Sequence, residues 1–419
     1  MSDLEYWIWY AGLHRLRHRT RSALLERFGT PQGIWHAEER ELKRIEGILP
    51  DELGELLERK PGDAVRILRR CEEEEVQIIT MQDAAFPERL RMIPDPPCVL
   101  YVKGRLPAVD AEPVIGIVGT RRSTPYGDKM ARSIAYEIAF GGGIVTTGLA
   151  GGIDSRAAEG ALMAGGKVIG VLGCPINEVY PSYNTRLYQD VQTTGALVSE
   201  YPPDAGGNRS WFPQRNRIIA ALSVGVVVAE APVKSGALIT AARALDYGRD
   251  VFAVPSNADA ENGRGSNSLL REGAILAENG WDVLKEYEAR FPERIHKAEH
   301  GTLPEEYAIP EENRRAEKSP VSEQSEEKPR GFFKFRVPVR KKETSAPQEP
   351  SKLENQLASL NENQLKIVGV MDRASMHVDD IIDLTRLPAS AVLSELTMLQ
   401  IKGFVTQESG KRFTLNISK

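Results

Sequence analysis

The stretch that decides the fold is Val114-Ile115-Gly116-Ile117-Val118-Gly119-Thr120-Arg121-Arg122-Ser123-Thr124-Pro125-Tyr126-Gly127. Its first five residues are all apolar or glycine, which is typical of a central parallel strand buried on both faces. Five further short apolar runs follow up to residue 254, and the amphipathic segments 128–140, 154–164 and 237–247 lie between some of them. Alternating strands and helices indicate βαβ units, so we predict an α/β domain with a doubly wound parallel sheet.

The loop after this first strand carries side chains that suit a phosphate. In an open α/β sheet, ligands bind beyond the carboxyl ends of the strands, where the strand order reverses. Gly119 lets a ligand approach the backbone, Thr120 offers a hydroxyl, and Arg121 and Arg122 can bind phosphate in a bidentate manner. A helix that opens near Pro125 would direct free amides to the same place. We therefore expect a phosphate site here rather than a plain turn with solvated arginines.

The segment 209–219 combines aromatic and basic side chains. Its polar and aromatic members include Arg209, Trp211, Phe212, Arg215, Asn216 and Arg217. Aromatic rings beside arginines suit a stacked base flanked by phosphates. Because Arg215 and Arg217 are two positions apart, they cannot share a helix face, and we expect at least one to form a structural ion pair. Further along, Ser235-Gly236 opens another helix and predicts a second amide-rich anion site.

Catalytic machinery is missing from the same region. None of the six histidines lies between residues 75 and 287, which disfavours a histidine-based triad and a histidine-ligated metal there. Cys174 has no histidine near it in the sequence, so we expect an inert thiol. We read Asp154 as a helix N-cap rather than a catalytic acid. No GxGxxG follows a strand, and the residues around Gly166-Lys167 fail as a P-loop. We expect no catalytic residue, no metal and no cofactor.

Composition divides the chain into four regions. Residues 1–74 read as short helices, 75–287 as the α/β domain, 288–352 as a disordered linker rich in Pro, Glu, Lys, Arg and Ser, and 353–419 as a winged-helix domain. The linker segment 328–342 has seven Lys or Arg and three Phe. It is either a nucleic-acid-binding arm or a solvated spacer.

Charge and cysteine content exclude several classes of protein. The net charge of −5 means that a nucleic-acid site must come from local clustering. Three widely spaced cysteines argue against a disulfide framework and a zinc site. The first residues form no basic leader, and no apolar run approaches the roughly 20 residues that span a bilayer. We expect a soluble cytoplasmic protein that does not bind membranes.

In order and spacing, the motifs of residues 80–285 resemble the DNA-processing protein A family (DprA, also called Smf). The matching residues are Val118-Gly119-Thr120-Arg121-Arg122, Gly148-Leu149-Ala150, Gly152-Ile153-Asp154, Leu172-Gly173-Cys174, Tyr180-Pro181, Ser199-Glu200-Tyr201-Pro202, Phe212-Pro213, Arg215-Asn216-Arg217-Ile218-Ile219, Ser235-Gly236 and Val251-Phe252-Ala253-Val254-Pro255. The terminal regions match the sterile-alpha-motif-like and winged-helix domains of that family more loosely.

The resemblance implies an extended Rossmann-like domain in a protein without enzymatic turnover that binds and protects single-stranded DNA. It also implies self-association as a homodimer and loading of the RecA recombinase during natural transformation. Carried over by residue, the DNA pocket would contain Gly119, Arg121, Gly148, Phe212 and Arg215, with Arg209 where the family often has a basic residue. Gly151 stands where an arginine is common, and Ala158 where a histidine is common.

Two other classes of function compete with this reading. A nucleoside-phosphate hydrolase of the lysine-decarboxylase-like group needs a PGGxGT loop, which the sequence lacks. A sequence-specific regulator would read bases through its winged helix, yet residues 390–401 contain no arginine or lysine, so protein docking suits that helix better. The helical region 1–74 also lacks the second glycine of a DNA-gripping hairpin, and we expect a structural or protein-binding role there.

Overall fold

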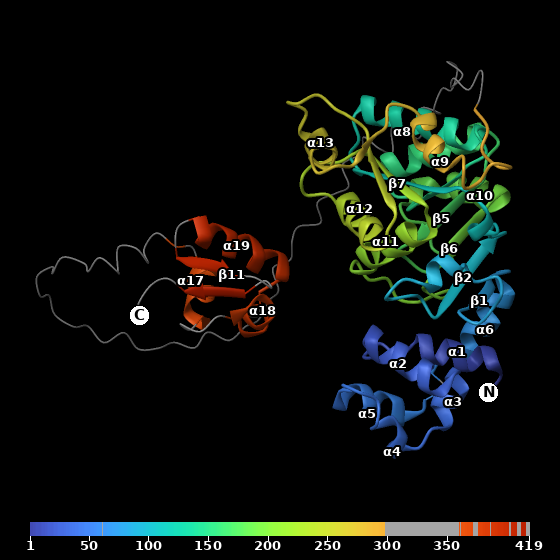
Figure 1. Cartoon of the computed structure of the whole chain (residues 1–419). Helices are drawn as coiled ribbons and strands as arrows, with labels where there is room; N and C mark the ends of the chain where they lie inside the picture. Colours follow the sequence, from blue (N-terminus) through green and yellow to red (C-terminus); the bar gives the residue numbers. More distant parts are fainter. Residues whose placement is uncertain are drawn as a thin grey trace, which may run out of the picture. The chain divides into compact units, whose positions relative to one another are not determined.

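Nine strands form one sheet in the larger part of the molecule (Figure 1). The computed structural model divides into two compact units, residues 1–323 and 324–419. The residues that it describes are 1–60, 62–297, 360, 362–371, 376–385, 387–401, 404–408 and 412–415. The segment 328–342 and most of the expected linker lie outside the described residues.

The sheet of the first unit is doubly wound, as predicted. Its strands are β1 (Gln77–Thr80), β2 (Val99–Gly104), β3 (Val114–Gly119), β4 (Ile144–Thr147), β5 (Val168–Leu172), β6 (Ala196–Ser199), β7 (Gly225–Glu230), β8 (Asp250–Ala253) and β9 (Ile275–Leu276). Their order is β1-β2-β6-β5-β4-β3-β7-β8-β9, and all pairs from β6 to β9 are parallel. The order reverses between β3 and β7, so the β3 loop lies at the switch point.

Two further strands extend the predicted parallel sheet at one edge. β1 pairs with β2, and β2 with β6, in antiparallel orientation. The short runs 77–80 and 99–104 carry no helix between them that could make a parallel crossover, because α7 (Glu88–Arg91) is only four residues long. An antiparallel edge is therefore the arrangement that this connection permits.

Helices cover both faces of the sheet. On one face lie α8 (Pro125–Phe140), α9 (Ile153–Met163), α10 (Thr185–Thr194) and α14 (Gly280–Leu284), and on the other α7, α11 (Trp211–Leu222) and α12 (Gly236–Asp246), with α13 (Arg264–Arg271) following β8. Alternate residues of β3 serve the two cores: Ile115 and Ile117 face the first set, and Val114 and Val118 the second. Burial on both sides explains why this strand is continuously apolar.

The N-terminal helices share a core with the sheet. They are α1 (Asp3–Ala11), α2 (His18–Phe28), α3 (Pro31–His36), α4 (Glu39–Leu42), α5 (Pro50–Glu58) and α6 (Ala64–Glu73). Ser2 and Glu5 form a capping box at α1, and prolines occupy the first turns of α3 and α5. Trp7 and Tyr10 belong to the same buried cluster as Tyr101 of β2. The helical region thus packs on the β1–β2 end of the sheet (Figure 1).

The second unit has the predicted winged-helix pattern. It contains α17 (Glu362–Val370), β10 (Met376–His377), α18 (Val378–Thr385), α19 (Ala389–Ile401), β11 (Val405–Glu408) and β12 (Arg412–Leu415). The three strands pair in the order β10-β12-β11, so the predicted hairpin gains a short third strand. Ile381, Val392, Leu396 and Leu399 centre its separate core.

Two local predictions from the sequence are wrong. Asp154 is not an N-cap: α9 begins at Ile153, and its N-cap is Gly152 with φ of +71°. Phe291 and Ile295, which the sequence analysis assigns to the linker, are buried in the core of the first unit.

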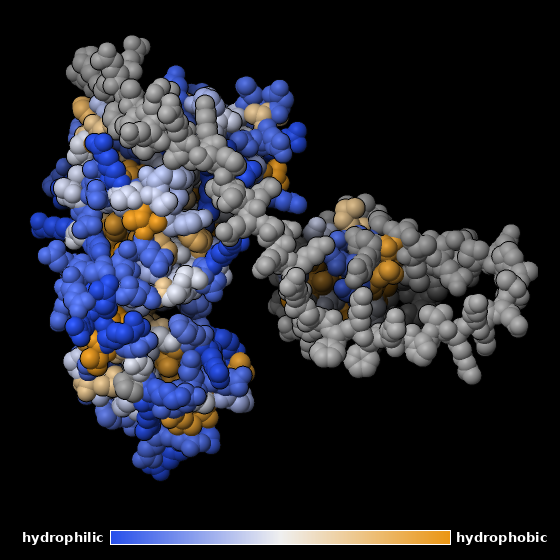
Figure 2. Space-filling model, turned by 180° about the vertical axis from the view of Figure 1, so that it is seen from behind, coloured by the Kyte–Doolittle hydropathy of each residue, from blue (hydrophilic) through white to orange (hydrophobic). Residues whose placement is uncertain are grey.

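No helix among the described residues is long and apolar enough to cross a membrane. On the face that Figure 2 shows, the first unit is mostly hydrophilic, with separate hydrophobic patches.

Candidate nucleic-acid interface

The β3–α8 loop is held in shape by Glu230 at the end of β7. The Glu230 side chain accepts hydrogen bonds from the Thr124 amide (2.8 Å) and the Thr124 hydroxyl (2.6 Å), and its backbone carbonyl accepts one from the Thr120 amide (2.8 Å). Glu230 is only 1% exposed. Thr124 then caps α8 by accepting from the Gly127 amide. A buried carboxylate on one strand therefore fixes the loop of the neighbouring strand.

Three exposed arginine side chains lie at this edge of the sheet. Arg121 and Arg122 follow β3, and Arg209 precedes α11, and all three are exposed. Within the described part of the chain, the ion pairs involve none of these three arginines. Thr120 lies beneath them, 9% exposed, and its hydroxyl accepts a hydrogen bond from the Arg122 amide. The edge therefore presents exposed guanidinium groups outside these ion pairs, and such groups bind phosphate well.

Arg215 lies beneath the loops rather than on the surface. It is 4% exposed, and its Nη1 donates to the carbonyl oxygens of Gly148 (2.8 Å) and Val171. These carbonyls belong to the carboxyl ends of β4 and β5, so a single guanidinium joins two strand ends. Burial lowers the pKa of Arg215, although the nearby charge of Asp154 opposes the shift. The contribution of Arg215 is a fixed positive charge that supports the site from below.

Asp154 is the acidic partner in this buried layer. Burial raises the pKa of its carboxyl, whereas Arg215 and hydrogen bonds from the Ala150 and Gly119 amides act to lower it. A Cβ placed on Gly148 would lie 2.6 Å from an Asp154 carboxylate oxygen and would also collide with Arg215 Nη2. Only glycine therefore fits at position 148, because two buried charged groups close on it.

Phe212 forms the centre of an aromatic cluster at the same edge. The Arg121 guanidinium carbon lies over its ring at 5.1 Å from the centroid, within cation–π range. Tyr180, from the loop after β5, packs against it at a centroid distance of 5.1 Å and an interplanar angle of 50°. Next to it, Trp211 stacks on Tyr201 with centroids 3.8 Å apart. The fold thus brings the aromatic rings of the 209–219 segment together with the exposed Arg121.

Arg217 is held in buried ion pairs. It is 5% exposed, it donates to Glu200 at 2.7 and 2.9 Å, and its Nε lies 3.3 Å from Asp95. Arg217 is the structural ion-pair member that the two-residue spacing predicts. The neighbouring Asn216 instead reaches α12, where its amide donates to the Gly236 carbonyl (3.2 Å).

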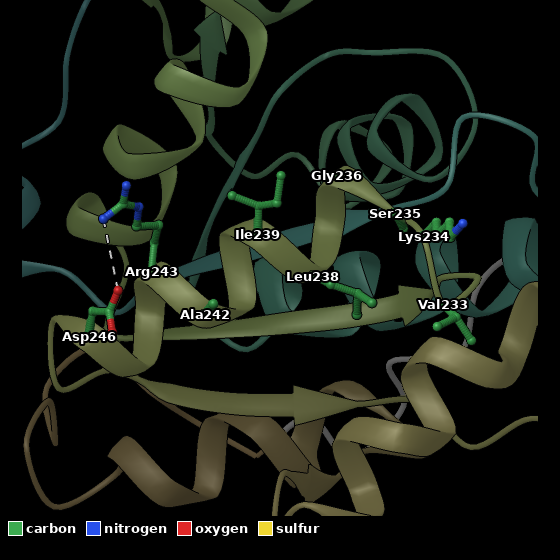
Figure 3. Close-up of a pocket in the computed structure, with 9 residues that line it drawn as sticks. All are labelled: Val233, Lys234, Ser235, Gly236, Leu238, Ile239, Ala242, Arg243 and Asp246. Carbon is green, nitrogen blue, oxygen red and sulfur yellow. Dashed lines mark ion pairs between the residues drawn. The ribbon is translucent and has the colours of Figure 1, made fainter. Parts of the chain in front are cut away.

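Ser235 and Gly236 open α12 beside a shallow groove. The Ser235 side chain caps the helix by accepting from the Ala237 amide. A hollow of about 680 Å³ follows the exposed side of the helix, and it is lined by Val233, Lys234, Ser235, Gly236, Leu238, Ile239, Ala242, Arg243 and Asp246. Figure 3 shows Lys234 and Ser235 at one end and the Arg243–Asp246 ion pair (3.9 Å) at the other. These two predicted residues therefore border an apolar groove instead of the aromatic cluster.

The remaining chemistry of the site is poor in reactive groups. Cys174 is buried, and burial raises the pKa of its thiol to about 11. At neutral pH this cysteine is protonated and a weak nucleophile. Among the residues that the structure describes, no three His, Cys, Asp or Glu side chains form a metal-binding group.

Sequence reasoning missed the supporting residues Glu230, Tyr180 and Tyr183. A Cβ on Gly151 would collide with the Tyr183 hydroxyl, so this tyrosine fills the space beside the position where the family commonly has an arginine. Ala158, the other departure, is fully buried in α9. The two tyrosines lie in the segment 180–183, whose Tyr180-Pro181 pair is one of the family motifs. Glu230 has no comparable sequence feature, because it looks like the ordinary end of a strand.

Fold and site together define a class: a Rossmann-like protein with an aromatic and basic loop edge, joined to a winged-helix domain. The comparisons place the chain more narrowly. The family model described as DNA recombination-mediator protein A matches residues 77–288, and the DprA winged-helix model matches 346–411. The chain belongs to the DprA/Smf family, as the sequence motifs indicate.

Individual relatives agree with this assignment. Protein Smf of Synechocystis is 31% identical over 419 residues, which cover 98% of each chain. DNA processing protein DprA of Bacillus subtilis is 37% identical over 55% of this chain and 76% of its own. The X-ray structure of DprA from Streptococcus pneumoniae matches with a TM-score of 0.59 and 32% identity, covering 68% of this chain and 99% of that chain.

Proposed function

We propose that the first unit binds single-stranded DNA, without strong sequence preference, through the carboxyl edge of its sheet. The observation that carries this proposal is the position of the exposed Arg121 guanidinium over the Phe212 ring. An arginine can hold the backbone phosphate while neighbouring rings stack on unpaired bases. Paired bases are stacked inside a duplex, so an edge of this kind favours single strands.

Arg121→Ala tests the proposal. Single-strand affinity of the full chain should fall, and the slope of log K against log salt should decrease by about 0.7, the value for one phosphate contact on a single strand. Binding is measured by fluorescence anisotropy across a salt titration, with single-stranded and duplex DNA in parallel.

Arg27→Ala is the matched control, because Arg27 of α2 also lies over a phenylalanine ring, at 5.7 Å, but belongs to the N-terminal helical region and not to the loops that follow β3 and precede α11. Equal affinity of the wild type for duplex and single strand, or an unchanged slope in Arg121→Ala, would refute the proposed site.

We also propose that the protein acts by binding and has no catalytic turnover. The raised pKa of Cys174 and the lack of histidine between residues 75 and 287 support this. Nuclease, nucleoside-phosphate hydrolase and ATPase assays of the purified chain should all remain at background. Turnover that a point substitution in the loop edge abolishes would favour the hydrolase alternative instead.

We further propose that the chain is a homodimer that associates through the α12 groove. Lys234 and Asp246 lie at opposite ends of this groove, so two antiparallel copies of α12 would pair unlike charges across exposed Val233, Ile239 and Leu245. Sedimentation should show a dimer that Ile239→Glu dissociates. Val65→Glu, at a 65%-exposed position of α6, should leave the dimer intact, and a monomeric wild type would exclude self-association.

A role in loading RecA is the last part of the proposal. Its support is membership in a family described as recombination mediators. The protein should accelerate RecA assembly on single-stranded DNA coated with single-strand-binding protein, and Arg121→Ala should reduce the effect. Unchanged assembly rates in the presence of the wild-type protein would rule this role out.

A further inference from the structure

Tyr180 is the exposed ring of the aromatic cluster at the loop edge. Its relative exposure is 48%, whereas Phe212, Trp211 and Tyr201 are all partly buried. A single exposed tyrosine is ordinary on a protein surface. This one differs because it packs on Phe212, whose ring also contacts the exposed Arg121 guanidinium.

The Phe212 ring is already engaged by its neighbours. Arg121 and Tyr180 each lie 5.1 Å from its centroid, and Gly173 approaches so closely that a Cβ there would lie 2.7 Å from a ring carbon of Phe212. Phe212 therefore supports the neighbouring side chains, and Tyr180 is the more accessible ring for an incoming base.

The backbone around Tyr180 is fixed from two directions. The Tyr188 hydroxyl of α10 donates to the Tyr180 carbonyl (2.9 Å). Asn184, four residues later, donates to the Leu149 carbonyl and the Ser155 hydroxyl, both at 2.9 Å. The turn is thus tied to the β4–α9 loop, and Tyr180 is positioned before any ligand arrives, which limits the entropy lost on binding.

We propose that Tyr180 forms a subsite for an unpaired nucleobase, which stacks on the exposed face of its ring while Arg121 holds the adjoining phosphate. This inference rests on the proposed single-strand binding and assigns its base contact to a residue outside the 209–219 motif. Stacking on a phenol ring uses the π-face that every base has, so the subsite tolerates any sequence.

The experiment compares the full-length wild type with Tyr180→Ala, Tyr180→Leu and Tyr180→Phe. The probes are a thymine oligonucleotide and an oligonucleotide of equal length with no bases on its sugars. On the thymine strand, Tyr180→Ala and Tyr180→Leu should each bind about tenfold more weakly, whereas Tyr180→Phe should resemble the wild type. The salt slope should stay unchanged, since no phosphate contact is lost.

The base-free strand separates stacking from a merely structural role. On it, all four proteins should bind alike, because there is nothing to stack. Phe140→Ala, at a 41%-exposed ring at the opposite end of α8, is the control for loss of a surface aromatic and should bind both strands normally.

The outcomes distinguish this inference from the proposed function. If the wild type fails to bind single strands, the proposed function fails. If the wild type binds but Tyr180→Ala is equally tight on thymine, or loses affinity equally on the base-free strand, the Tyr180 subsite is overturned and single-strand binding stands. Retained affinity in Tyr180→Leu would likewise overturn it, because leucine can fill space but cannot stack.

Discussion

Gly148 shows how a residue without a side chain defines the floor of the site. Its carbonyl accepts a hydrogen bond from Arg215, and its Cα faces both Arg215 and Asp154. Neither neighbour can withdraw easily, because both are buried, 4% and 7% exposed, and both are held by backbone groups. The glycine is required here for close approach, and its own backbone angle is unexceptional.

We expect Gly148→Ala to destabilise the first unit by about 1–3 kcal/mol, the usual cost of overpacking a buried site. Urea unfolding followed by tryptophan fluorescence measures this change, because all five tryptophans lie in residues 1–323. Gly236→Ala is the matched control, since a Cβ there would meet no atom within 4 Å. Equal unfolding midpoints for the two variants would contradict this account of position 148.

At the scale of elements, Glu52 joins α5 to the segment that leads into α2. Its carboxylate accepts from the Arg17 amide, the Arg17 guanidinium, the Thr20 hydroxyl and the Leu49 amide, at 2.8 to 3.0 Å. Burial by itself would raise the pKa of Glu52, but these hydrogen bonds outweigh it and lower the pKa to about 2. One side chain therefore caps a helix and anchors a neighbouring loop.

The lowered pKa of Glu52 predicts that the folded protein loses stability in acid. Because the folded-state pKa lies below the ordinary value of 4.5, the stabilisation is complete above that pH and is lost as the pH falls toward 2. The difference in unfolding free energy between wild type and Glu52→Gln should shrink by about 2 kcal/mol between pH 7 and pH 3. Glu46→Gln, at a side chain that is 91% exposed, is the control for the substitution itself. A constant gap for Glu52→Gln between pH 7 and pH 3 would contradict the assignment.

At the scale of the whole molecule, the two units bury separate cores. The core of residues 324–419 centres on Ile381, Val392, Leu396 and Leu399, none of which belongs to the clusters of the first unit. The uneven distribution of tryptophan provides a way to observe the units separately.

Leu396→Ala, at a fully buried position of α19, should destabilise the second unit by about 2–5 kcal/mol. Calorimetry of the full chain should show the change, while the midpoint reported by tryptophan fluorescence should stay where it is in the wild type. Leu393→Ala, at a 47%-exposed position of the same helix, is the control and should leave both readings nearly unchanged. A fluorescence midpoint that follows Leu396→Ala would show that the two cores unfold together.

The sequence by itself determined the local elements and the chemistry of the loops. Continuous apolar runs such as 114–118 mark strands buried on two faces, and Thr124-Pro125 marks the start of α8, because burial and capping leave signals within a few residues. The exposed positions of Arg121 and Arg122 also followed from their place at a strand end.

Which of these residues contact one another became clear from the tertiary structure alone. Arg215 and Arg217 look alike in the sequence, yet one holds two strand ends and the other pairs with Glu200. Glu230 supports a loop 106 positions away, and Tyr180 packs on Phe212. Such contacts depend on the order of strands in the sheet, because neighbouring strands bring together loops that are distant in the chain. Strand order is fixed by how all the elements pack, and no local pattern of residues encodes it.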